Sequence, residues 1–377
     1  MKLLEIIHVA TPGGAEKNTR LITKAFRRLG LEVTLVYPPG PYAPQYESLA
    51  ELGVECICCD LKRNVLSSVL FVRRLLMSRH IELIHSHMHG ADFIASAARL
   101  GLNDVRHFST IHFLPQDNYQ LLHRIKSTLI TAFAFHRMHR IFAPSTHVAV
   151  RARREYLLPR DRVVMLLNSI DFEEMRPDAR AVKQLRARWN ADGRTRLLVC
   201  AGALVRVKGH GHLIRAMAQL CQLHDNLKLI LLGEGDRERE LKTLARERGV
   251  DDYVHFVGYQ PNIVDWLSLA DIYVQPSLCD TMPRALLEAM YMGLPVVTTS
   301  LETISEVVTN GVNGITVPPA SADSIVAGVR ALLGDPVMAR ELGRAARRFV
   351  TKHCSMDSMA RSILDCLDVP LSQAGPQ

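Results

Sequence analysis

The sequence is poor in aromatic residues and lacks long apolar runs. Phenylalanine, tryptophan and tyrosine make up 6% of the 377 residues, and two of them are tryptophan. We find no zinc-finger pattern and no aromatic platform for bases, which argues against a nucleic-acid partner. No apolar stretch approaches the ~18 residues that a membrane-spanning helix needs. Residues 1–14 carry Glu5 and no cleavage motif, unlike a signal peptide, so a cytoplasmic location is expected.

The cysteines do not indicate a disulfide framework. Most of the eight lie in apolar strand or helix patterns, which suits buried free thiols in a reducing compartment. Three of them cluster in the extended stretch "VECICCD". A zinc site needs four convergent ligands, so a metal there is disfavoured.

Length and charge set the remaining bounds. Domains usually hold ~100–200 residues, so this chain predicts two. Hydrophobic residues at 48% and charged residues at 22% fit a soluble globular protein. A net charge of +8 favours an anionic partner such as nucleic acid, anionic lipid or a phosphorylated substrate, and the alternative is a generic basic enzyme.

Apolar strand patterns alternate with helical patterns in two series. The first runs from "LLEIIHVA" to "VRHFSTIHF", and the second starts near residue 195 with "RLLVCAGAL". Such alternation predicts two doubly wound α/β units with parallel sheets, joined near residues 168–190. Ligands of these folds bind beyond the carboxyl ends of the strands, so the expected site is the cleft between the two domains.

Two acids flank the start of a predicted helix in "SLCDTMPRALLEAMYMGLPVVTT". Asp280 lies in the loop before the helix, Pro283 suits its first turn, and Glu288 lies about two turns deeper. Backbone N–H groups of that turn could donate to anions or hydroxyls, and the carboxylates could accept from sugar hydroxyls. The alternative is structural: Asp280 caps the helix and Glu288 pairs with Arg284.

Two further loops could bind phosphate. "AGALVRVKGHGHLI" places Arg206 and Lys208 between a strand and a helix, where cations and a helix N-terminus favour phosphate, although both could be solvated charges. "TPGGAEKN" is a second strand–glycine loop–helix stretch with Gly13 and Gly14, but it is not a full dinucleotide fingerprint.

These stretches together resemble glycosyltransferase family 4. "AGALVRVKGH", "LLGEGDRERELK", "VHFVGYQPNI" and the two-acid stretch occur in that family's order and spacing. "TPGGAEK" and "LNSIDFEEMRP" resemble its N-terminal glycine loop and interdomain stretch. The resemblance implies a retaining enzyme with a nucleotide-sugar donor and a GT-B fold of two Rossmann-like domains. The expected domains are 1–175 for the acceptor and 176–360 for the donor, followed by a helix end and loose tail at 361–377.

The resemblance also implies roles for individual residues. Asp280 and Glu288 match the family's Glu-x7-Glu motif, which contacts the donor sugar and ribose, and His112 matches a histidine near the donor sugar. We therefore expect Asp280, Glu288 and His112 as the catalytic group. The expected donor-binding residues are Gly13, Gly14, Arg206, Lys208, Met282, Pro283, Arg284 and Glu306. No metal or other cofactor is expected.

The sequence departs from the family pattern at three places. Asp280 is shorter than the usual Glu, which changes its reach to the sugar by ~1.5 Å. Ala203 replaces an Arg before the lysine, and Arg206 is expected to supply that charge. The usual Gly-Gly is absent from "SLETISEVV", although Glu306 is retained.

Two other stretches suggest additional contacts. The basic and apolar residues 120–157 fit contact with an anionic membrane surface, with an ordinary packed helix as the alternative. That contact would make the protein peripheral on the inner face of the cytoplasmic membrane, and the acceptor a lipid-linked glycan in polysaccharide or lipopolysaccharide synthesis. "HSHMHG" places His85, His87 and His89 on one face of a strand, where a metal site is disfavoured against a buried strand.

Two other functions stay open at this point. A sugar-nucleotide epimerase or phosphorylase of the same fold would share the donor site. A non-catalytic member that binds nucleotide sugars would share the motifs without transfer.

Overall fold

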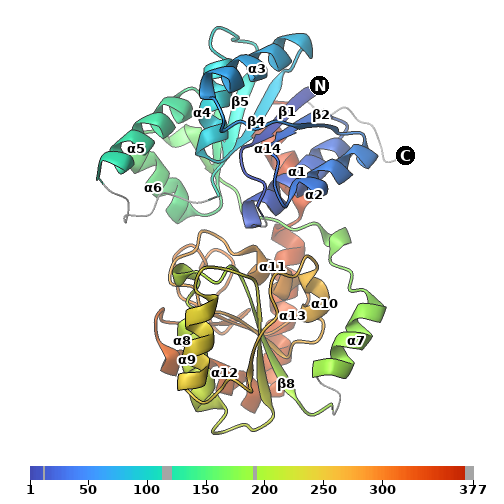
Figure 1. The fold of residues 1–377 in the computed structure, drawn as a ribbon, viewed down its shortest axis with the longest axis vertical. Coiled ribbons are helices and arrows are strands. Elements are labelled where there is room, and N and C mark those ends of the chain that lie inside the picture. Colours follow the sequence, from blue (N-terminus) through green and yellow to red (C-terminus); the bar gives the residue numbers. More distant parts are fainter. Residues whose placement is uncertain (12, 113–120, 190–192, 370–377) are drawn as a thin grey trace. The chain divides into compact units, whose positions relative to one another are not determined.

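The computed structural model describes residues 1–11, 13–112, 121–189 and 193–369, without the side chains of 121–124. This part of the chain forms two compact units, each built on a parallel β-sheet (Figure 1). The first unit is Met1–Ser169 with Met356–Gln377, and the second is Ile170–Ser355. The predicted pair of doubly wound α/β units is confirmed.

The described residues of the first unit contain a seven-stranded sheet in the order β3-β2-β1-β4-β5-β6-β7. Its strands are β1 (Lys2–Ile7), β2 (Glu32–Tyr37), β3 (Glu55–Cys58), β4 (Leu83–His87), β5 (Arg106–Thr110), β6 (Arg140–Ala143) and β7 (Val163–Met165). Its α-helices are α1 (Gly14–Arg28), α2 (Ala43–Glu47), α3 (Val65–Ser78), α4 (His89–Ala98), α5 (Leu121–His136), α6 (Thr146–Tyr156) and α14 (Met356–Cys366). The strand order reverses between β1 and β4, which makes the crevice at their carboxyl ends a preferred ligand position.

The pleat of β1 assigns its side chains to two cores. Leu3 and Ile7 pack in a cluster with residues of α1 and α14, whereas Leu4 and Ile6 pack in a cluster with residues of α3 and α4. Successive strand residues point to opposite faces of a sheet. Glu5 therefore lies on the α1 face, where the other inward residues of β1 are apolar.

The chain returns to the first unit at its end. Helix α14 packs against α1, and Met359, Ile363 and Leu364 belong to the same core as Leu3. The structure thus divides the chain at 169/170 and again at 355/356, not at 175/176 and 360/361 as expected. The physical reason is that the apolar face of α14 completes the α1 side of the first sheet. The expected loose tail falls partly on 370–377, outside the described residues.

The described residues of the second unit contain a six-stranded sheet in the order β10-β9-β8-β11-β12-β13. Its strands are β8 (Arg196–Ala201), β9 (Leu227–Leu232), β10 (Val254–Phe256), β11 (Ile272–Gln275), β12 (Val296–Thr299) and β13 (Ile315–Val317). Its α-helices are α7 (Ala179–Trp189), α8 (His210–Leu220), α9 (Glu238–Glu247), α10 (Ile263–Leu267), α11 (Arg284–Tyr291), α12 (Ala322–Gly334) and α13 (Pro336–His353). Helices α8, α9 and α12 cover one face of this sheet and α10, α11 and α13 the other (Figure 1). The order reverses between β8 and β11, so the two motif loops follow the strands of that reversal.

The basic stretch 120–157 folds as α5, β6 and α6, although residue 120 lies outside the described part. Ile125 and Leu129 on α5 are 48% and 66% exposed. A search of the described residues finds no helix with the length and apolar character needed to cross a membrane.

Candidate active site

The loops after β8, β9 and β11 are packed backbone to backbone in the second unit. Gly209 has φ +70, and a Cβ there would lie 1.9 Å from the carbonyl oxygen of Pro276. Gly233 has φ +136, and its Cβ would lie 2.2 Å from the carbonyl oxygen of Gly202. Any other residue would collide at either place and would need a rarely adopted conformation. These glycines hold the loop of residues 202–208 against its two neighbours.

Lys208 and Asp280 meet across these loops. The Nζ atom of Lys208 donates to Oδ2 of Asp280 at 2.6 Å, and the side chains are 23% and 8% exposed. The two residues come from adjacent strand ends at the reversal of the sheet. The cation and the acid that the sequence placed at opposite ends of a donor are therefore paired with each other in this structure.

A buried polar chain leads to Asp280 from the sheet. The Tyr273 hydroxyl donates to Oε1 of Gln275 at 2.6 Å, and Nε2 of Gln275 donates to the Ser277 hydroxyl at 2.8 Å. The Ser277 hydroxyl donates to Oδ2 of Asp280 at 3.1 Å. Burial, with Cys200 and the nearby acids, raises the pKa of Tyr273 well above its usual value, so the phenol stays a donor. The sequence motif did not reveal this chain, although "IYVQPS" holds its polar residues at alternate positions.

Glu288 is buried and pairs with Arg284. Nε of Arg284 donates to Oε1 of Glu288 at 3.1 Å, four residues along α11. This is the ion pair that the sequence left open as an alternative. Asp280 is not the cap of α11, because Pro283 occupies the N-cap position without a side-chain bond.

The other expected donor residues lie on the same loops. Arg206 is exposed in a short 3-10 turn, and its side chain has no hydrogen bond or ion pair with another described residue. Met282 is buried, and Glu306 is half-buried in the turn after β12. Thr303, in the stretch where the family has Gly-Gly, donates its hydroxyl to the carbonyl oxygen of Asp280 at 2.6 Å. The loop that lacks the family's Gly-Gly is thus hydrogen-bonded to Asp280, which stands where the family has Glu.

His210 is a residue of this region that the sequence analysis did not select. It opens α8 directly after Gly209 and is buried, and neither ring nitrogen has a hydrogen-bond partner. Burial, with Lys208 and Arg237 nearby, lowers the pKa of His210 to about 4. The ring is neutral near pH 7 and carries one N–H donor next to the lysine loop.

The glycine loop of the first unit lies against an acid. Gly13 is the N-cap of α1, and a Cβ there would lie 2.6 Å from Oε2 of Glu16. Oε1 of Glu16 accepts from the Thr11 hydroxyl at 2.8 Å, while Gly14 opens α1 with open space where a Cβ would lie. A carboxylate beside the loop repels a phosphate, so this loop suits a hydroxyl-bearing group better than an anion.

His112 belongs to a buried network at the reversal point of the first sheet. Glu5 lies opposite His85, and His87 lies opposite Thr110, in the strand register. Glu5 contacts Nδ1 of His85 through Oε1 at 3.0 Å and Nε2 of His87 through Oε2 at 2.8 Å. Nδ1 of His87 then contacts Nε2 of His112 at 2.9 Å.

The structure changes the expected histidine triplet. His85 and His87 share one face of β4, but His89 begins α4 and contacts Thr131 at 3.3 Å. A buried acid from the neighbouring strand, Glu5, lies beside His85 and His87. Glu5, His85 and His87 are the group of potential metal ligands found among the described residues.

A second polar cluster lies in the first unit. Oδ1 of Asp92 accepts from the hydroxyls of Ser86 and Ser109 at 2.6 Å and 2.8 Å. The pKa of Asp92 is raised to about 7, because the effect of burial exceeds the opposing effect of the two serine hydrogen bonds. The cluster is buried and holds β4 to β5.

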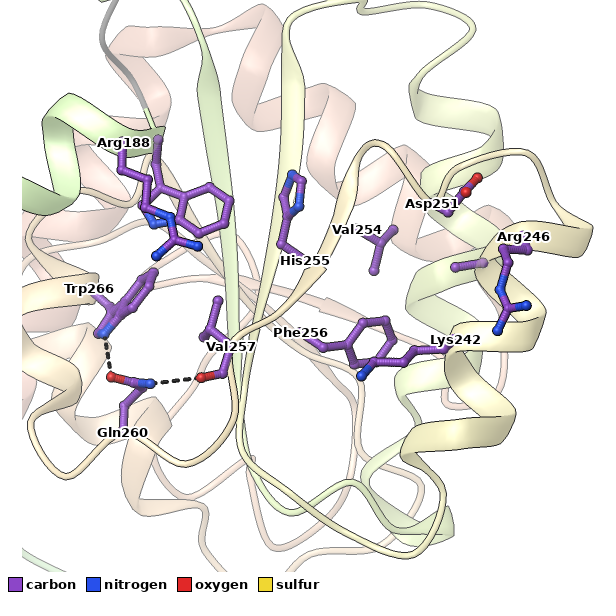
Figure 2. Close-up of a pocket in the computed structure, with 12 residues that line it drawn as sticks. Arg188, Lys242, Arg246, Asp251, Val254, His255, Phe256, Val257, Gln260 and Trp266 are labelled. Carbon is purple, nitrogen blue, oxygen red and sulfur yellow. Dashed lines mark hydrogen bonds between the residues drawn. The ribbon is translucent and has the colours of Figure 1, made fainter.

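A hollow of about 760 Å³ in the second unit lies elsewhere (Figure 2). Its lining includes Arg188, Trp189, Lys242, His255 and Phe256. Figure 2 shows Gln260 accepting from the Trp266 indole and donating to the carbonyl oxygen of Val257. None of the expected donor residues lines it, so we do not assign the donor to this hollow.

The two halves of the chain match two different protein-family models. The family "Glycosyl transferases group 1" matches residues 182–349, and "Glycosyltransferase Family 4" matches residues 12–174. The chain belongs to these glycosyltransferases. The two matches together take in both units that the structure shows.

Individual relatives support the same family. A GDP-mannose-dependent alpha-(1-6)-phosphatidylinositol monomannoside mannosyltransferase of Mycobacterium tuberculosis is 28% identical over 64% of this chain and 60% of its own. The first curated relatives match over 46% to 60% of their own length.

Two solved structures share the fold. HepE of Anabaena, solved with UDP, has a TM-score of 0.82 at 19% identity, over 98% of this chain and 100% of its own. WaaG, a glycosyltransferase of lipopolysaccharide biosynthesis, has a TM-score of 0.74 at 17% identity, over 99% and 100%. The GT-B fold is thereby shown.

Proposed function

We propose that this protein transfers a sugar, with retention, from a nucleotide-sugar donor to a glycan acceptor. The observation that carries the proposal is the meeting of Lys208 and Asp280 at the strand reversal of the second unit, with Glu288 on the next helix. A cation serves the donor pyrophosphate, and carboxylates serve sugar and ribose hydroxyls. The similarity to a GDP-mannose-dependent enzyme and to the UDP-bound HepE supports a nucleotide-sugar donor.

The transfer step needs stabilisation of the leaving diphosphate. Negative charge develops on the phosphate oxygen as the glycosidic bond to it breaks, and Lys208 and Arg206 neutralise it. The acceptor hydroxyl attacks from the face that the phosphate leaves, and the departing phosphate takes its proton. Neither a protein nucleophile nor a metal ion is required. In the first unit, His112 and the Gly13–Gly14 loop are the proposed sugar contacts.

Donor binding and anomeric outcome test the proposal directly. UDP, GDP and their sugars should stabilise the protein by mass action, ~2.7 kcal/mol at a hundredfold excess over the dissociation constant. The product of a transfer assay, followed by NMR, should keep the donor's anomeric configuration in the presence of EDTA. Inversion, or donor conversion without an acceptor, would replace the proposal by an inverting enzyme or an epimerase.

A variant at Arg206 tests whether this side chain supplies the positive charge of the missing family arginine. Arg206→Ala should weaken donor binding by roughly tenfold, the loss of one charge-assisted contact. Arg196→Ala, which removes an equal charge that pairs with Asp271, is the matched control and should leave donor binding unchanged. Wild-type donor affinity in Arg206→Ala would remove Arg206 from the site.

We propose further that the acceptor is a lipid-linked glycan and that the protein acts at the cytoplasmic membrane surface, in polysaccharide or lipopolysaccharide synthesis. Leu129 and Ile125 are exposed on α5 beside the exposed Lys126, a pattern that favours an anionic lipid surface. WaaG, which shares the fold, is involved in lipopolysaccharide biosynthesis. The protein should float with anionic but not zwitterionic vesicles at low salt, and Leu129→Ser should reduce flotation. If the protein floats with neither the anionic nor the zwitterionic vesicles, the membrane role is refuted.

A further inference from the structure

The hollow of about 760 Å³ in the second unit lies along β10, at one edge of the described six-stranded sheet. Residues of α7, α9, α10 and β10 line it, and His255 lies between Arg188 and Arg246 in Figure 2. Its volume is within the range of about 300–1,000 Å³ that is typical of ligand pockets. The proposed donor site follows β8 and β11 instead, so the hollow is a separate place in the same unit.

Three rings form a cluster in this lining. The centroid of the Trp189 ring lies 4.8 Å from that of His255 and 6.1 Å from that of Trp266. The Trp266 indole donates to Oε1 of Gln260 at 3.2 Å. The Trp189 indole N–H and Nε2 of His255, by contrast, are buried without a hydrogen-bond partner. A buried polar group without a partner is costly, so both atoms favour a ligand that supplies one.

Hydroxyl groups suit both of these atoms. Burial, with Lys228 and Arg188 nearby, lowers the pKa of His255, so its ring is neutral near pH 7. A nitrogen of a neutral imidazole either donates or accepts, and the Trp189 indole only donates. A hydroxyl can meet each of them, because it both donates and accepts. The unpartnered atoms therefore favour a ligand with several hydroxyl groups.

The charged side chains of the lining favour an anion. The cations of the described lining are Arg188, Lys242 and Arg246, and its acid is Asp251. Lys242 pairs with Glu238 at 2.5 Å. Arg188 and Arg246 form no ion pair with another described residue. Two guanidinium groups therefore stay available to acidic groups of a ligand.

These two guanidinium groups are held apart. Arg188 comes from α7 and Arg246 from α9, on opposite sides of His255 in Figure 2. A single arginine binds one carboxylate through two parallel hydrogen bonds. A phosphate monoester carries a charge of about −1.5 to −2 and is typically bound by an arginine cluster. The separation therefore fits carboxylates on different units of a chain better than one phosphate group.

We propose that this hollow binds an acidic oligosaccharide, a chain of sugars with carboxylate groups on separate units. Arg188 and Arg246 each bind one carboxylate, and sugar hydroxyls contact the Trp189 indole and His255. The binding does not depend on sugar transfer, whereas a role of the bound chain as acceptor or product rests on the proposed function. In that role the hollow raises the effective concentration of the glycan, because a second contact keeps the chain on the protein.

A single-stranded nucleic acid is the alternative, because bases stack on aromatic rings and phosphates bind arginine. Two observations favour the sugar chain. The guanidinium carbon of Arg188 lies 4.9 Å from the centroid of the Trp189 ring, so a cation already covers a face on which a base would stack. A nucleic acid also carries a charge on every unit, which two unpaired arginines do not match.

Tryptophan fluorescence reports on this hollow specifically. The chain has two tryptophans, Trp189 and Trp266, and both line it. Hexagalacturonate, a chain of uronic acids, should change the emission of the full-length protein saturably at low salt. Maltohexaose, a neutral chain of the same length, should bind at least about tenfold more weakly, because it lacks the charge-assisted contacts. No response to hexagalacturonate overturns the proposal, as does equal affinity for maltohexaose.

Arginine variants locate the binding. Arg188→Ala and Arg246→Ala should each weaken hexagalacturonate binding by roughly tenfold, the loss of one hydrogen-bonded charge. Arg340→Ala removes an equally exposed charge from α13, outside the described lining, and should leave the affinity unchanged. All three side chains are exposed, so the variants should fold. Wild-type affinity in both lining variants, or an equal loss in the control, overturns the proposal.

Two further titrations separate this proposal from its alternatives. If oligothymidylate of similar length binds more tightly than hexagalacturonate, the hollow is a nucleic-acid site and the proposal is overturned. Calorimetric titration with UDP and GDP reports on the donor site. Nucleotide binding without hexagalacturonate binding would refute the glycan site and leave the proposed function standing. Hexagalacturonate binding without nucleotide binding would support the glycan site and refute only the donor assignment.

Discussion

Asp280→Asn should strengthen the binding of a nucleoside diphosphate while weakening sugar transfer. Lys208 donates to Asp280 at 2.6 Å, so a donor pyrophosphate must compete with a carboxylate for the same ammonium group. A hydrogen bond to a charged group contributes about 1.5–3 kcal/mol net. The amide keeps an uncharged hydrogen bond, which places the relief at the lower end of that range, or roughly tenfold in the dissociation constant.

Isothermal titration with UDP and with GDP measures this change without requiring turnover. Lys208→Met should move affinity in the opposite direction, because it removes the phosphate contact. Asp271→Asn is the control for net charge: it also neutralises an acid paired at 2.6 Å, with Arg196, and should leave affinity unchanged. Weaker nucleotide binding in Asp280→Asn would show that Asp280 does not compete for Lys208, and the proposed role of the pair would be wrong.

The structure yields three other predictions. Glu288→Gln should lower transfer by about a hundredfold or more, as loss of one transition-state contact does, with an unchanged circular dichroism spectrum; near-normal turnover would exclude Glu288 from the site. Gly209→Ala should lower the midpoint of thermal unfolding and abolish nucleotide stabilisation, because its Cβ would lie 1.9 Å from a carbonyl oxygen; an unaffected variant would contradict the packed loops. The pKa of Asp92 is about 7 in the folded state, against an ordinary value of 3.8. Between these two pH values the folded state keeps a proton that the unfolded chain releases, so the free energy of unfolding falls as the pH rises from 3.8 to about 7. Asp92→Asn, which mimics the protonated form, should therefore gain on the wild type by on the order of 2 kcal/mol between pH 5 and pH 8 in urea unfolding, and a constant difference would refute the shift.

Sequence patterns predicted the helices and strands because the causes of these elements lie in neighbouring residues. Alternating apolar runs gave the strands, and Pro283 marked the start of α11, which begins at Arg284 with Pro283 as its N-cap. The return of α14 to the first unit was not predictable in the same way. Its apolar face shows that it packs, but periodicity does not show which of two sheets receives it.

The same limit applies to the candidate site. Asp280 and Glu288 stand out because they lie eight positions apart in one stretch, yet the pairing of Asp280 with Lys208 depends on strand order. Glu5 served the sequence analysis only as a charge that interrupts an apolar run. Its contacts with His85 and His87 follow from a register between strands 80 residues apart, which no local pattern contains.

The placement of α14 has a consequence for synthesis on the ribosome. The second unit is one continuous segment, Ile170–Ser355, so all of its strands are synthesised before α14. The first unit is made earlier but lacks the helix that covers α1 until α14 has been synthesised. Domains that emerge first usually fold first. Here the earlier segment must wait with part of its core uncovered, so truncation before residue 356 would leave the α1 face of the first unit exposed and the second unit whole.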